Sequence, residues 1–410
     1  EVAMAEVLVG RQPIFNRYME VFAYELLYRS GDMNAATFRD GDKATTQVIL
    51  NTLLEMGLDS IVGDAKAFIN LTRNFLVGKY PILLPANRVV IEILEDIKSD
   101  AQVIAAARDL HNAGFTIALD DVITSDRITP FCGISSIIKL DLKQIDFFNL
   151  PDIINACKQN GFQVLAEKVE TQSDYNMCRR LGVDYYQGYF LCKPNIMRGK
   201  KMDSSRLVIM QSLALLQNQK ATFTDLESII ARDVGLSYKL LRLSNSGYYS
   251  FAQEVKSLRQ AISLIGLDTM RGWMSLLLMT SLQDKPPELT NIALQRARMA
   301  ESMARLYGQA QPEIYFLVGL FSVLDALMDQ PMDQLVKELN LSEPVSGALL
   351  RNEGLPGVVL NGIKAHENGD WDTVMKLNIP PETLTNLYLD SIKWTNILSD
   401  EIRQADSLAN

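Results

Sequence analysis

The chain has 410 residues, of which 48% are hydrophobic and 22% charged, and its formal net charge is −9. This length accommodates two domains, and the composition is typical of a folded globular protein rather than a disordered one. The acidic balance, without Lys- or Arg-rich runs, argues against nucleic acid as the main partner. The most apolar window, residues 273–282, is about half the length that a membrane crossing needs, so we expect no membrane span.

The small numbers of cysteines and histidines limit the cellular compartment and the kinds of metal site that we expect. The first residues lack the charged and then apolar pattern of a signal peptide, so none is expected. The 4 cysteines form no C-x-x-C pair, which favours reduced thiols in a cytoplasmic protein. With only 2 histidines, His111 and His366, the chain cannot assemble a zinc or iron centre built on several imidazoles.

Residues 7–194 alternate between short apolar runs and helical patterns. Runs typical of buried strands lie at residues 21–27, 67–71, 89–94, 115–119, 136–140, 163–166 and 184–189. Glycines such as Gly114, Gly161 and Gly182 precede strands and close the helix before them. Repeated strand–helix units predict a parallel sheet with helices outside it. Because polar residues follow most strands, we predict a closed (β/α)8 TIM-like barrel rather than an open doubly wound sheet.

Near residue 200 the alternation of strands and helices gives way to helical periodicity alone. Residues 224–227 (T-D-L-E) form a capping-box signature, and residues 273–282 are expected to be a buried helix. Prolines such as Pro312 and Pro331 divide the remainder into helices of ordinary length. We therefore predict a barrel domain over residues 1–200 and an all-α domain over residues 203–410.

Polar residues recur at the carboxyl ends of the predicted strands, where barrel chemistry is placed. They are Glu25, Asn70, Glu92, Asp120, Asp121, Lys139, Glu167, Glu170 and Gln187. Most are carboxylates with one lysine to offset them, and each buried ion costs on the order of several kcal/mol to desolvate. Such a cluster requires cations, and oxygen ligands without His or Cys favour Mg²⁺ or Mn²⁺. Two such ions are a common device for attacking a phosphodiester.

Each of these residues also has an ordinary structural interpretation. Asp120 and Asp121 could only cap the segment that follows, and a single glutamate at a strand end is often solvated. Lys139 and Asp141 alternate on one strand and could pair with each other. The recurrence at successive strand ends favours a shared site over separate accidents.

The order of these residues resembles the EAL domain, a family of bacterial enzymes that hydrolyse cyclic di-GMP. Residues 24–29 (Y-E-L-L-Y-R) resemble its E-x-L-x-R signature, and residues 12–14 (Q-P-I) resemble its upstream segment. Later matching segments are I-N-L-T (69–72), E-I-L-E (92–95), D-D (120–121), K-L-D (139–141), A-E-K-V-E-T (166–171) and Q-G-Y-F-L-C-K-P (187–194). The ordered match spans roughly residues 7–195.

The resemblance implies roles for the acidic residues. The ligands of a first metal ion would be Glu25, Asn70, Glu92 and Asp120. Asp120 would bridge to a second ion, which Asp121 would complete. Glu167 would act as general base or orient the attacking water, and Lys139 would contact that water or the phosphate.

The same resemblance implies how the nucleotide is held. Arg29 would meet a phosphate, Gln12 a guanine edge, and Gln187 the phosphate or its water. Glu95 and Glu170 would be supporting residues.

Two segments depart from the EAL pattern. After the two aspartates the family usually continues F-G-x-G-Y-S, whereas residues 122–127 read V-I-T-S-D-R, with no glycine before Gly133. Lys168 stands where the family usually has glycine. Side chains at these positions restrict the backbone conformations that glycine allows. A ligand site whose catalytic groups are displaced would bind without cutting.

The second half resembles the HDOD domain, a helical relative of HD-type phosphohydrolases that lacks their metal ligands. The resemblance lies in residues 236–246 and 262–266. Ser322 and Val323 stand where an HD protein would place its His-Asp pair, so no catalysis is expected from this half. His366 is expected at the surface or at a helix end. By analogy, this domain would bind a protein partner.

Two functions remain open. The first is hydrolysis of cyclic di-GMP to linear pGpG with two Mg²⁺ or Mn²⁺ ions, and the second is a non-catalytic receptor or scaffold that binds the nucleotide or a protein. A glycosidase using two barrel carboxylates is disfavoured, because it leaves Asn70 and Lys139 without a role. By resemblance to EAL proteins, a homodimer is expected.

Overall fold

The computed structural model describes residues 7–30, 57–78, 82–122, 128–192, 260, 264, 274, 285–339 and 341–407. The chain folds into two compact units. The first unit comprises residues 1–193 and 365–386, and the second comprises residues 194–364 and 387–410. The predicted boundary between residues 200 and 203 remains a proposal.

The first unit contains a closed barrel of eight strands, which confirms the predicted fold class. The strands follow one another around the barrel in sequence order. They are β1 (Val7–Asn16), β2 (Val21–Ser30), β3 (Lys66–Leu71), β4 (Val89–Ile93), β5 (Thr116–Leu119), β6 (Ile137–Asp141), β7 (Gln163–Glu167) and β8 (Tyr185–Gln187). Strands β2 to β8 pair in parallel, as predicted for this sheet.

Strand β1 is an exception to the parallel arrangement and is not among the predicted strands. It pairs antiparallel with β2, with Gln12 opposite Glu25, and antiparallel with β8, with Ile14 opposite Gln187. A short turn joins β1 to β2, in which the Asn16 Oδ1 accepts hydrogen bonds from the backbone N–H groups of Tyr18 and Glu20. A connection this short permits only antiparallel pairing, so the prediction of a wholly parallel sheet is wrong for β1.

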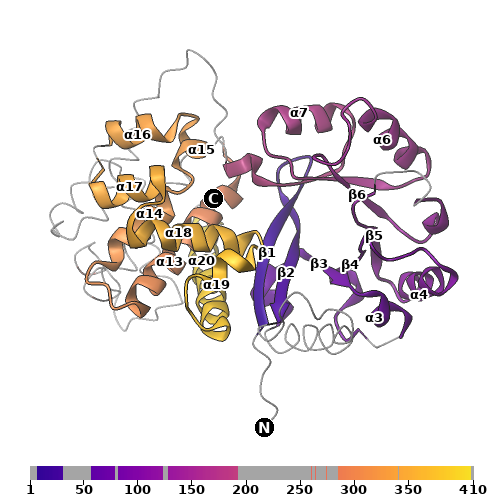
Figure 1. Ribbon diagram of the computed structural model, residues 1–410, viewed down its shortest axis with the longest axis horizontal. Helices are drawn as coiled ribbons and strands as arrows, with labels where there is room; N and C mark the ends of the chain where they lie inside the picture. Colours follow the sequence, from indigo (N-terminus) through magenta and orange to yellow (C-terminus); the bar gives the residue numbers. More distant parts are fainter. Residues whose placement is uncertain are drawn as a thin grey trace, which may run out of the picture. The chain divides into compact units, whose positions relative to one another are not determined.

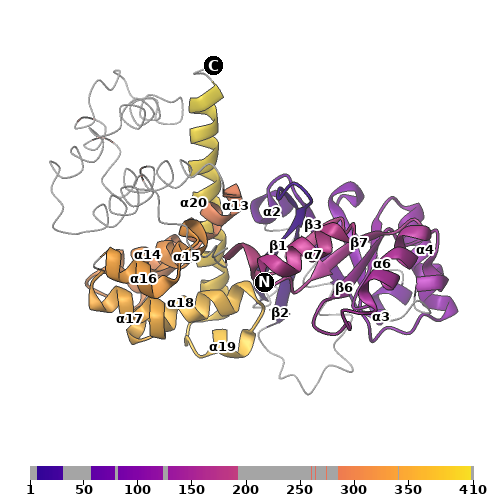
Figure 2. The ribbon, with the colours of Figure 1, turned by 90° about the horizontal axis from the view of Figure 1, so that it is seen from above.

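Helices cover the outside of the barrel (Figures 1 and 2). They are α2 (Leu58–Val62), α3 (Arg73–Val77), α4 (Ala101–Asn112), α6 (Leu150–Gln159) and α7 (Gln172–Arg180), with the 3-10 turns η1 (Ala86–Arg88), η2 (Thr129–Phe131) and η3 (Tyr189–Cys192). Local sequence sets where they begin: Asp100 accepts hydrogen bonds from the first turn of α4, and Thr171 forms a capping box with Asp174 at α7.

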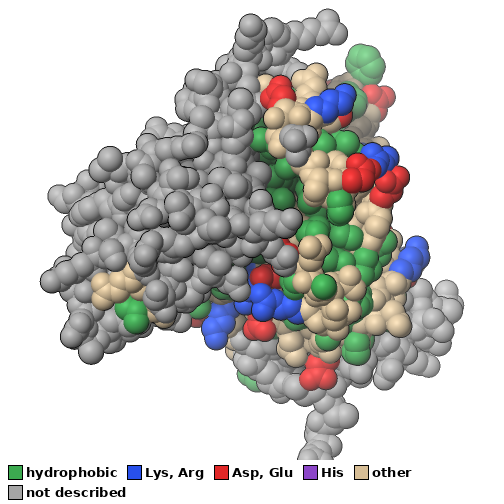
Figure 3. Space-filling model, turned by 90° about the vertical axis from the view of Figure 1, so that its left-hand side faces the viewer, with side chains coloured by type: hydrophobic (Ala, Val, Ile, Leu, Met, Phe, Trp, Pro, Cys, Tyr) green, Lys and Arg blue, Asp and Glu red, His purple; other side chains and the backbone are tan. Residues whose placement is uncertain are grey.

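The described residues beyond 285 form helices only, as predicted for the second half. These helices are α13 (Pro287–Leu306), α14 (Pro312–Phe321), α15 (Leu324–Met328), α16 (Met332–Glu338), α17 (Glu343–Arg351), α18 (Gly354–Glu367), α19 (Trp371–Met375) and α20 (Pro381–Ser407). Figure 3 shows one face of the molecule, on whose described part hydrophobic side chains are bordered by acidic and basic ones. No helix in the described ranges has both the length and the hydropathy that a bilayer crossing demands.

Several predictions for the helical half fall on residues without a description. Residues 224–227, 236–246 and nearly all of 262–266 and 273–282 lie outside the described residues, although Met274 is helical and buried. Ser322 follows α14 and accepts a hydrogen bond from the buried Arg296 Nη1 at 3.1 Å. Neither Ser322 nor Val323 is a metal-ligating side chain of the HD type.

His366 lies near the end of α18, one of its two predicted positions, but the predicted surface position is wrong. Its side chain is fully buried and packs edge-to-face on Trp371, with ring centroids 5.3 Å apart. Burial lowers the pKa of His366 to about 3, so the imidazole is neutral at physiological pH. The sequence pattern did not indicate this contact with Trp371 of α19.

Candidate active site

The barrel interior is built in layers, and one layer is polar. Beneath it lies an apolar layer formed by Ile14, Ala23, Phe68, Val90, Ala118, Ile137 and Leu165, one from each of seven strands. Because side chains alternate between the two faces of a strand, the residue two positions on points inward, one layer nearer the strand end. The polar layer therefore contains Glu25, Asn70, Glu92, Asp120, Lys139, Glu167 and Gln187, with Gln12 two residues before Ile14 because β1 runs the opposite way.

Lys139 lies at the centre of this layer. Its Nζ is 2.6 Å from Glu92 Oε1, 2.7 Å from Glu167 Oε1, 3.0 Å from Asp120 Oδ1 and 3.5 Å from Glu25 Oε1. The Lys139 side chain is 0% exposed. Carboxylates of β2, β4 and β7 and of the residue that follows β5 thus converge on one ammonium group of β6.

The charge of this cluster is unbalanced, because four carboxylates surround one lysine. Burial raises the pKa of Glu167 to about 8, although Lys139 opposes the rise. Burial also raises the pKa of Glu92 well above its ordinary range. Burial alone disfavours a charged Lys139, but the carboxylates, led by Glu167, hold its pKa well above the ordinary value. Without a further cation, the cluster keeps a charged lysine and protonates part of its carboxylates.

Asn70 adds an uncharged oxygen to the acidic layer. It pairs in register with Glu92 on the neighbouring strand, and its Oδ1 has no hydrogen-bond partner among the described residues. Its backbone oxygen accepts a hydrogen bond from Tyr28 Oη at 2.5 Å, which ties β2 to β3 beside the acids. Burial, reinforced by the charges of Glu92 and Glu25, raises the pKa of Tyr28, so its hydroxyl keeps its proton.

Asp120 and Asp121 follow β5 and continue the acidic layer towards the rim. Asp121 has a φ of 45°, in the left-handed region that L-residues seldom adopt. Its N–H donates to Asp120 Oδ1 at 3.1 Å, and its Oδ2 accepts a hydrogen bond from Gln144 Nε2 at 3.1 Å. Burial and the charge of Asp120 raise the pKa of Asp121.

The donor set fits a hard divalent cation. Asp120, Asp121 and Glu167 each offer a carboxylate oxygen, and these oxygens all lie within 4.8 Å of one another. Asn70 Oδ1 is an amide oxygen to which none of the described residues donates a hydrogen bond. Carboxylate and amide oxygens are the ligands that Mg²⁺ and Mn²⁺ prefer. Burial is the main cause of the raised pKa values of Glu92, Asp121 and Glu167, and a bound cation would favour their ionised forms.

The two predicted glutamine contacts meet at the seam between β8 and β1. Gln187 Nε2 donates to Gln12 Oε1 at 3.0 Å and also to Glu25 Oε2. Gln12 Nε2 in turn donates to Asn368 Oδ1 at 3.0 Å, in the segment 365–386 that belongs to the same compact unit as the barrel. Only glycine fits at position 188, directly after Gln187, because φ there is 146° and an added Cβ would lie 2.2 Å from the Val169 oxygen.

Of the predicted site residues whose side chains are described, Glu95 and Glu170 lie outside the cluster around Lys139. Glu95 is exposed beyond the end of β4. Glu170 pairs with Lys143 at the rim. Arg29 belongs to β2, but its side chain lies outside the described residues, as do residues 123–127 of the loop that departs from the EAL pattern.

Comparison with known proteins identifies two domains and two relatives that match over nearly the full length. The EAL domain matches residues 63–194, and the HDOD domain matches residues 204–338. The Bacillus subtilis protein YuxH, described as uncharacterized, is 32% identical over 405 residues, which cover 96% of this chain and 99% of YuxH. The cyclic di-GMP phosphodiesterase CdgJ of Vibrio cholerae is 32% identical over 404 residues, which cover 96% of this chain and 94% of CdgJ. The chain belongs to the EAL–HDOD family.

Family membership confirms the resemblance seen in the motifs. Among solved structures, this EAL–HDOD chain is similar to the EAL-domain protein YkuI of Bacillus subtilis in complex with c-di-GMP and calcium. The identity is 20%, the TM-score is 0.39, and the match covers 57% of this chain and 73% of YkuI. Klebsiella pneumoniae BlrP1 in complex with manganese and c-di-GMP is 21% identical, with a TM-score of 0.37 and coverage of 45% and 55%.

A group of contacts beside Asp121 in this EAL–HDOD protein was not predicted. Lys139 does not pair with Asp141, the alternative suggested by their spacing. Lys168 pairs with Asp141 instead, and Gln144 Nε2 also donates to Asp141 Oδ2 at 3.0 Å. Lys168 at the family's glycine position was the sequence signal, but its partner could not be read from the sequence.

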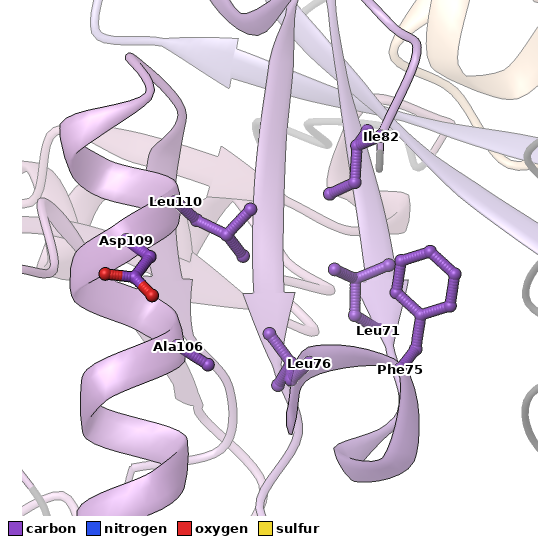
Figure 4. Close-up of a pocket in the computed structure, with 7 residues that line it drawn as sticks. All are labelled: Leu71, Phe75, Leu76, Ile82, Ala106, Asp109 and Leu110. Carbon is purple, nitrogen blue, oxygen red and sulfur yellow. The ribbon is translucent and has the colours of Figure 1, made fainter. Parts of the chain in front are cut away.

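A separate apolar pocket lies on the outside of the barrel in this EAL domain (Figure 4). It has a volume of about 170 Å³ and lies between β3, α3 and α4. Its lining consists of Leu71, Phe75, Leu76, Ile82, Ala106, Asp109 and Leu110. With one carboxylate and no convergent polar groups, it lacks the means to orient a phosphodiester.

Proposed function

We propose that this EAL–HDOD protein is a divalent-metal-dependent phosphodiesterase that opens cyclic di-GMP to linear pGpG. The observation that carries the proposal is the convergence of Glu25, Glu92, Asp120 and Glu167 on Lys139 at the barrel mouth. The name of CdgJ, which is related over nearly its whole length, supports the choice of substrate. An acidic mouth repels a phosphodiester unless cations neutralise it, so the metal requirement follows from the charge.

The metal ions would be held by residues of the polar layer. Glu25, Asn70, Glu92 and Asp120 would hold one ion, and Asp121 would complete the site of a second ion with Asp120. When bound, the ions would supply Lewis acidity and a counter-charge for the phosphate. Mg²⁺ and Mn²⁺ both suit this oxygen-only donor set.

Glu167 would take part in the proton transfer from the attacking water, and Lys139 would keep Glu167 in position. Bound divalent ions would favour the ionised form of the Glu167 carboxyl, so Glu167 would accept a proton from the attacking water. The oxygen of that water forms a bond to phosphorus, one phosphorus–ribose oxygen bond breaks, and the released ribose oxygen takes up a proton. Lys139 Nζ, 2.7 Å from Glu167 Oε1, would hold the Glu167 carboxylate in place during this transfer.

Substrate binding would use the seam between β8 and β1. Gln12 would meet a guanine edge, Arg29 a phosphate, and Gln187 a phosphate or its water. The mutual hydrogen bond of Gln12 and Gln187 supports a common role for the two amides. Glu95 and Glu170 would support the site from its rim.

A second candidate function is a receptor that binds cyclic di-GMP without cutting it. The observation that favours it is Lys168 at the position where EAL domains usually carry glycine, in contact with Asp141 near Asp121. A displaced second ion would leave nucleotide binding in place and slow the chemistry.

One experiment separates the two functions. The full-length protein is incubated with cyclic di-GMP and Mn²⁺, pGpG is followed by chromatography, and nucleotide binding is measured by calorimetry in parallel. We expect pGpG from the wild type, its loss by at least about 100-fold in Glu167→Gln, and retained binding by that variant. Asp152→Asn removes the same charge from an exposed position on α6 and serves as the control. Binding without product would support the receptor, and absence of both would contradict the two functions together.

We propose a cytoplasmic location, in agreement with the free thiols of Cys132, Cys157 and Cys178. We also propose that the HDOD domain binds a protein partner and that the chain forms a homodimer. Size-exclusion chromatography with light scattering tests the dimer: a mass near 46 kDa would contradict it.

A further inference from the structure

Lys168 occupies a backbone conformation that suits glycine. It follows Glu167, the last residue of β7, and has a φ of 53°, in the left-handed region. A lysine in this conformation costs about 1 kcal/mol or more relative to glycine. We therefore expect an interaction of the Lys168 side chain that offsets the cost of this backbone conformation.

The Lys168 side chain makes that interaction at the mouth of the barrel. Its Nζ forms an ion pair with Asp141 Oδ2. Asp141 ends β6, lies opposite Glu167 in the parallel register, and is 2% exposed, so its charge is held in place. The left-handed turn at Lys168 is what directs its side chain back across the strand ends to Asp141.

Gln144 connects this ion pair to Asp121. Its Nε2 donates to Asp141 Oδ2 at 3.0 Å and to Asp121 Oδ2 at 3.1 Å. One amide group thus joins a carboxylate neutralised by Lys168 to the carboxylate proposed to complete the second metal site. The hydrogen bond from Gln144 leaves Asp121 lone pairs for a cation but fixes the orientation in which this carboxylate would meet one.

The charges of this group all act on the same small volume. Oxygens of Asp120, Asp121 and Glu167 lie within 4.8 Å of one another, and Lys168 directly follows Glu167. The ammonium of Lys168 interacts electrostatically with the carboxylates of Asp141, Asp121 and Glu167. Because the ammonium of Lys168 offsets the charge of Asp141, Asp141 adds little attraction for a divalent cation between Asp120 and Asp121.

We propose that Lys168 and Gln144 are positioning residues that weaken the second metal site, so that the protein fills its first site at much lower metal concentration than its second. This inference rests on the proposed function, because it assigns Asp121 to the second ion. Lys168 acts through its charge and through Asp141, and Gln144 acts by holding the Asp121 carboxylate. The chain would then bind cyclic di-GMP with one ion and cut it only when the second ion is supplied.

Titration of Mn²⁺ into the metal-free full-length protein, without nucleotide, tests this inference. Calorimetry gives the affinity of each site, and electron paramagnetic resonance of free Mn²⁺ gives the stoichiometry. We expect two unequal sites in the wild type. In Lys168→Met the second site should bind about tenfold more tightly, because the charge of Asp141 is then no longer offset, while the first site changes little.

Three further variants make the result specific. Lys168→Arg keeps the charge and should behave as the wild type. Lys158→Met removes a lysine from a similar ion pair with Asp184, which precedes β8 at the opposite end of the barrel, and should leave both sites unchanged. Lys168→Gly removes charge and backbone strain together, so it should fold well and also strengthen the second site.

The outcomes separate the inference from the proposed function. Two unequal sites in the wild type with an unchanged second site in Lys168→Met and Lys168→Gly would overturn the inference alone. A loss of thermal stability in Lys168→Met without a change in Mn²⁺ affinity would do the same, since it would show a purely structural ion pair. Failure of the wild type and all variants to bind Mn²⁺ would overturn both the inference and the proposed function.

Discussion

Lys139 is the residue on which the acidic layer depends in the absence of metal. Four carboxylates from β2, β4, β5 and β7 lie within 3.5 Å of its Nζ. Removal of one member of a buried charge cluster leaves the others uncompensated, and this usually costs more than the pair itself contributes. Divalent ions would supply the same positive charge from a different source.

Replacement of Lys139 by methionine should therefore destabilise the metal-free protein. We expect a loss of about 3–5 kcal/mol in the free energy of unfolding at pH 8, measured by urea denaturation with a chelator present. The partly exposed pair of Lys158 and Asp184 provides the control, and Lys158→Met should cost about 1 kcal/mol or less. Similar losses in the two variants would contradict a central role for Lys139.

Glu167 should make the stability of the metal-free protein depend on pH. Its pKa is raised from 4.5 to about 8 in the folded state, so the folded protein binds a proton that the unfolded chain has released between these values. Stability from this group is therefore present at low pH and lost as pH rises towards 8, by at most about 1.4 kcal/mol per pH unit.

The comparison with Glu167→Gln isolates this effect. Thermal or urea unfolding between pH 5 and pH 8 should show the wild type losing stability relative to the variant as pH rises. Mn²⁺ should reverse the trend in the wild type, because metal binding favours the deprotonated carboxylate. Parallel curves for the two proteins in the metal-free state would refute the raised pKa.

At the scale of elements, the strand ends set the positions of the site residues, and glycine sets the path between β8 and η3. Gly188 passes so close to Val169 that no side chain fits, and its N-terminal neighbour Gln187 carries the contact to Gln12 and Glu25. The close contact between the backbones of Gly188 and Val169 thus helps to position the side chain of Gln187 in the site.

Gly188→Ala should be costly for this reason. We expect about 3 kcal/mol of lost stability from the close contact and the positive φ together. Gly161→Ala also places a side chain at positive φ, 79°, but has open space around it, so it should cost about 1 kcal/mol. Urea denaturation measures both variants, and equal losses would show that the contact with Val169 is unimportant.

The strand positions show how much of this architecture could be predicted from the sequence. The seven predicted strands match β2 to β8 to within a few residues, because apolar runs and glycine stops mark them clearly. The period of two along each strand then places the polar layer one step above the apolar one. Strand β1 escaped prediction because Arg11, Gln12 and Pro13 interrupt its apolar pattern, and only pairing with β2 and β8 identifies it.

The pairing of side chains was the part that the sequence could not supply. Lys139 on β6 and Glu25 on β2 lie on strands that do not neighbour each other in the barrel, and nothing in their spacing indicates a contact. Asp141 was a possible partner for Lys139 by alternation, but the left-handed turn at Lys168 brings a different lysine to it. The burial of His366 likewise depends on packing against Trp371 rather than on its own neighbours in sequence.

At the scale of the whole molecule, the domain boundary at residues 200–203 is a prediction with a direct test. Residues 365–386 belong to the same compact unit as the barrel, and Asn368 among them accepts a hydrogen bond from Gln12. A fragment of residues 1–200 should retain the closed barrel, because all eight strands lie within it. Without residues 365–386 it should unfold at a lower urea concentration than the full chain.

Far-UV circular dichroism and urea titration of that fragment test this prediction, because they report its secondary structure and its stability. A fragment that is unfolded in water would show that the barrel needs residues 365–386 and that the boundary is wrong. A fragment as stable as the full chain would show that these residues contribute nothing to the barrel.

The central claim is that the acidic layer of the barrel holds divalent ions, and anomalous scattering from Mn²⁺ in crystals of the full-length protein tests it most directly. We expect an anomalous peak for an ion coordinated by oxygens of Glu25, Asn70, Glu92 and Asp120. At high Mn²⁺ concentration we expect a second, weaker peak between Asp120 and Asp121. Ordered Mn²⁺ elsewhere on the protein, with Lys139 still alone among the four carboxylates at high Mn²⁺ concentration, would contradict the claim.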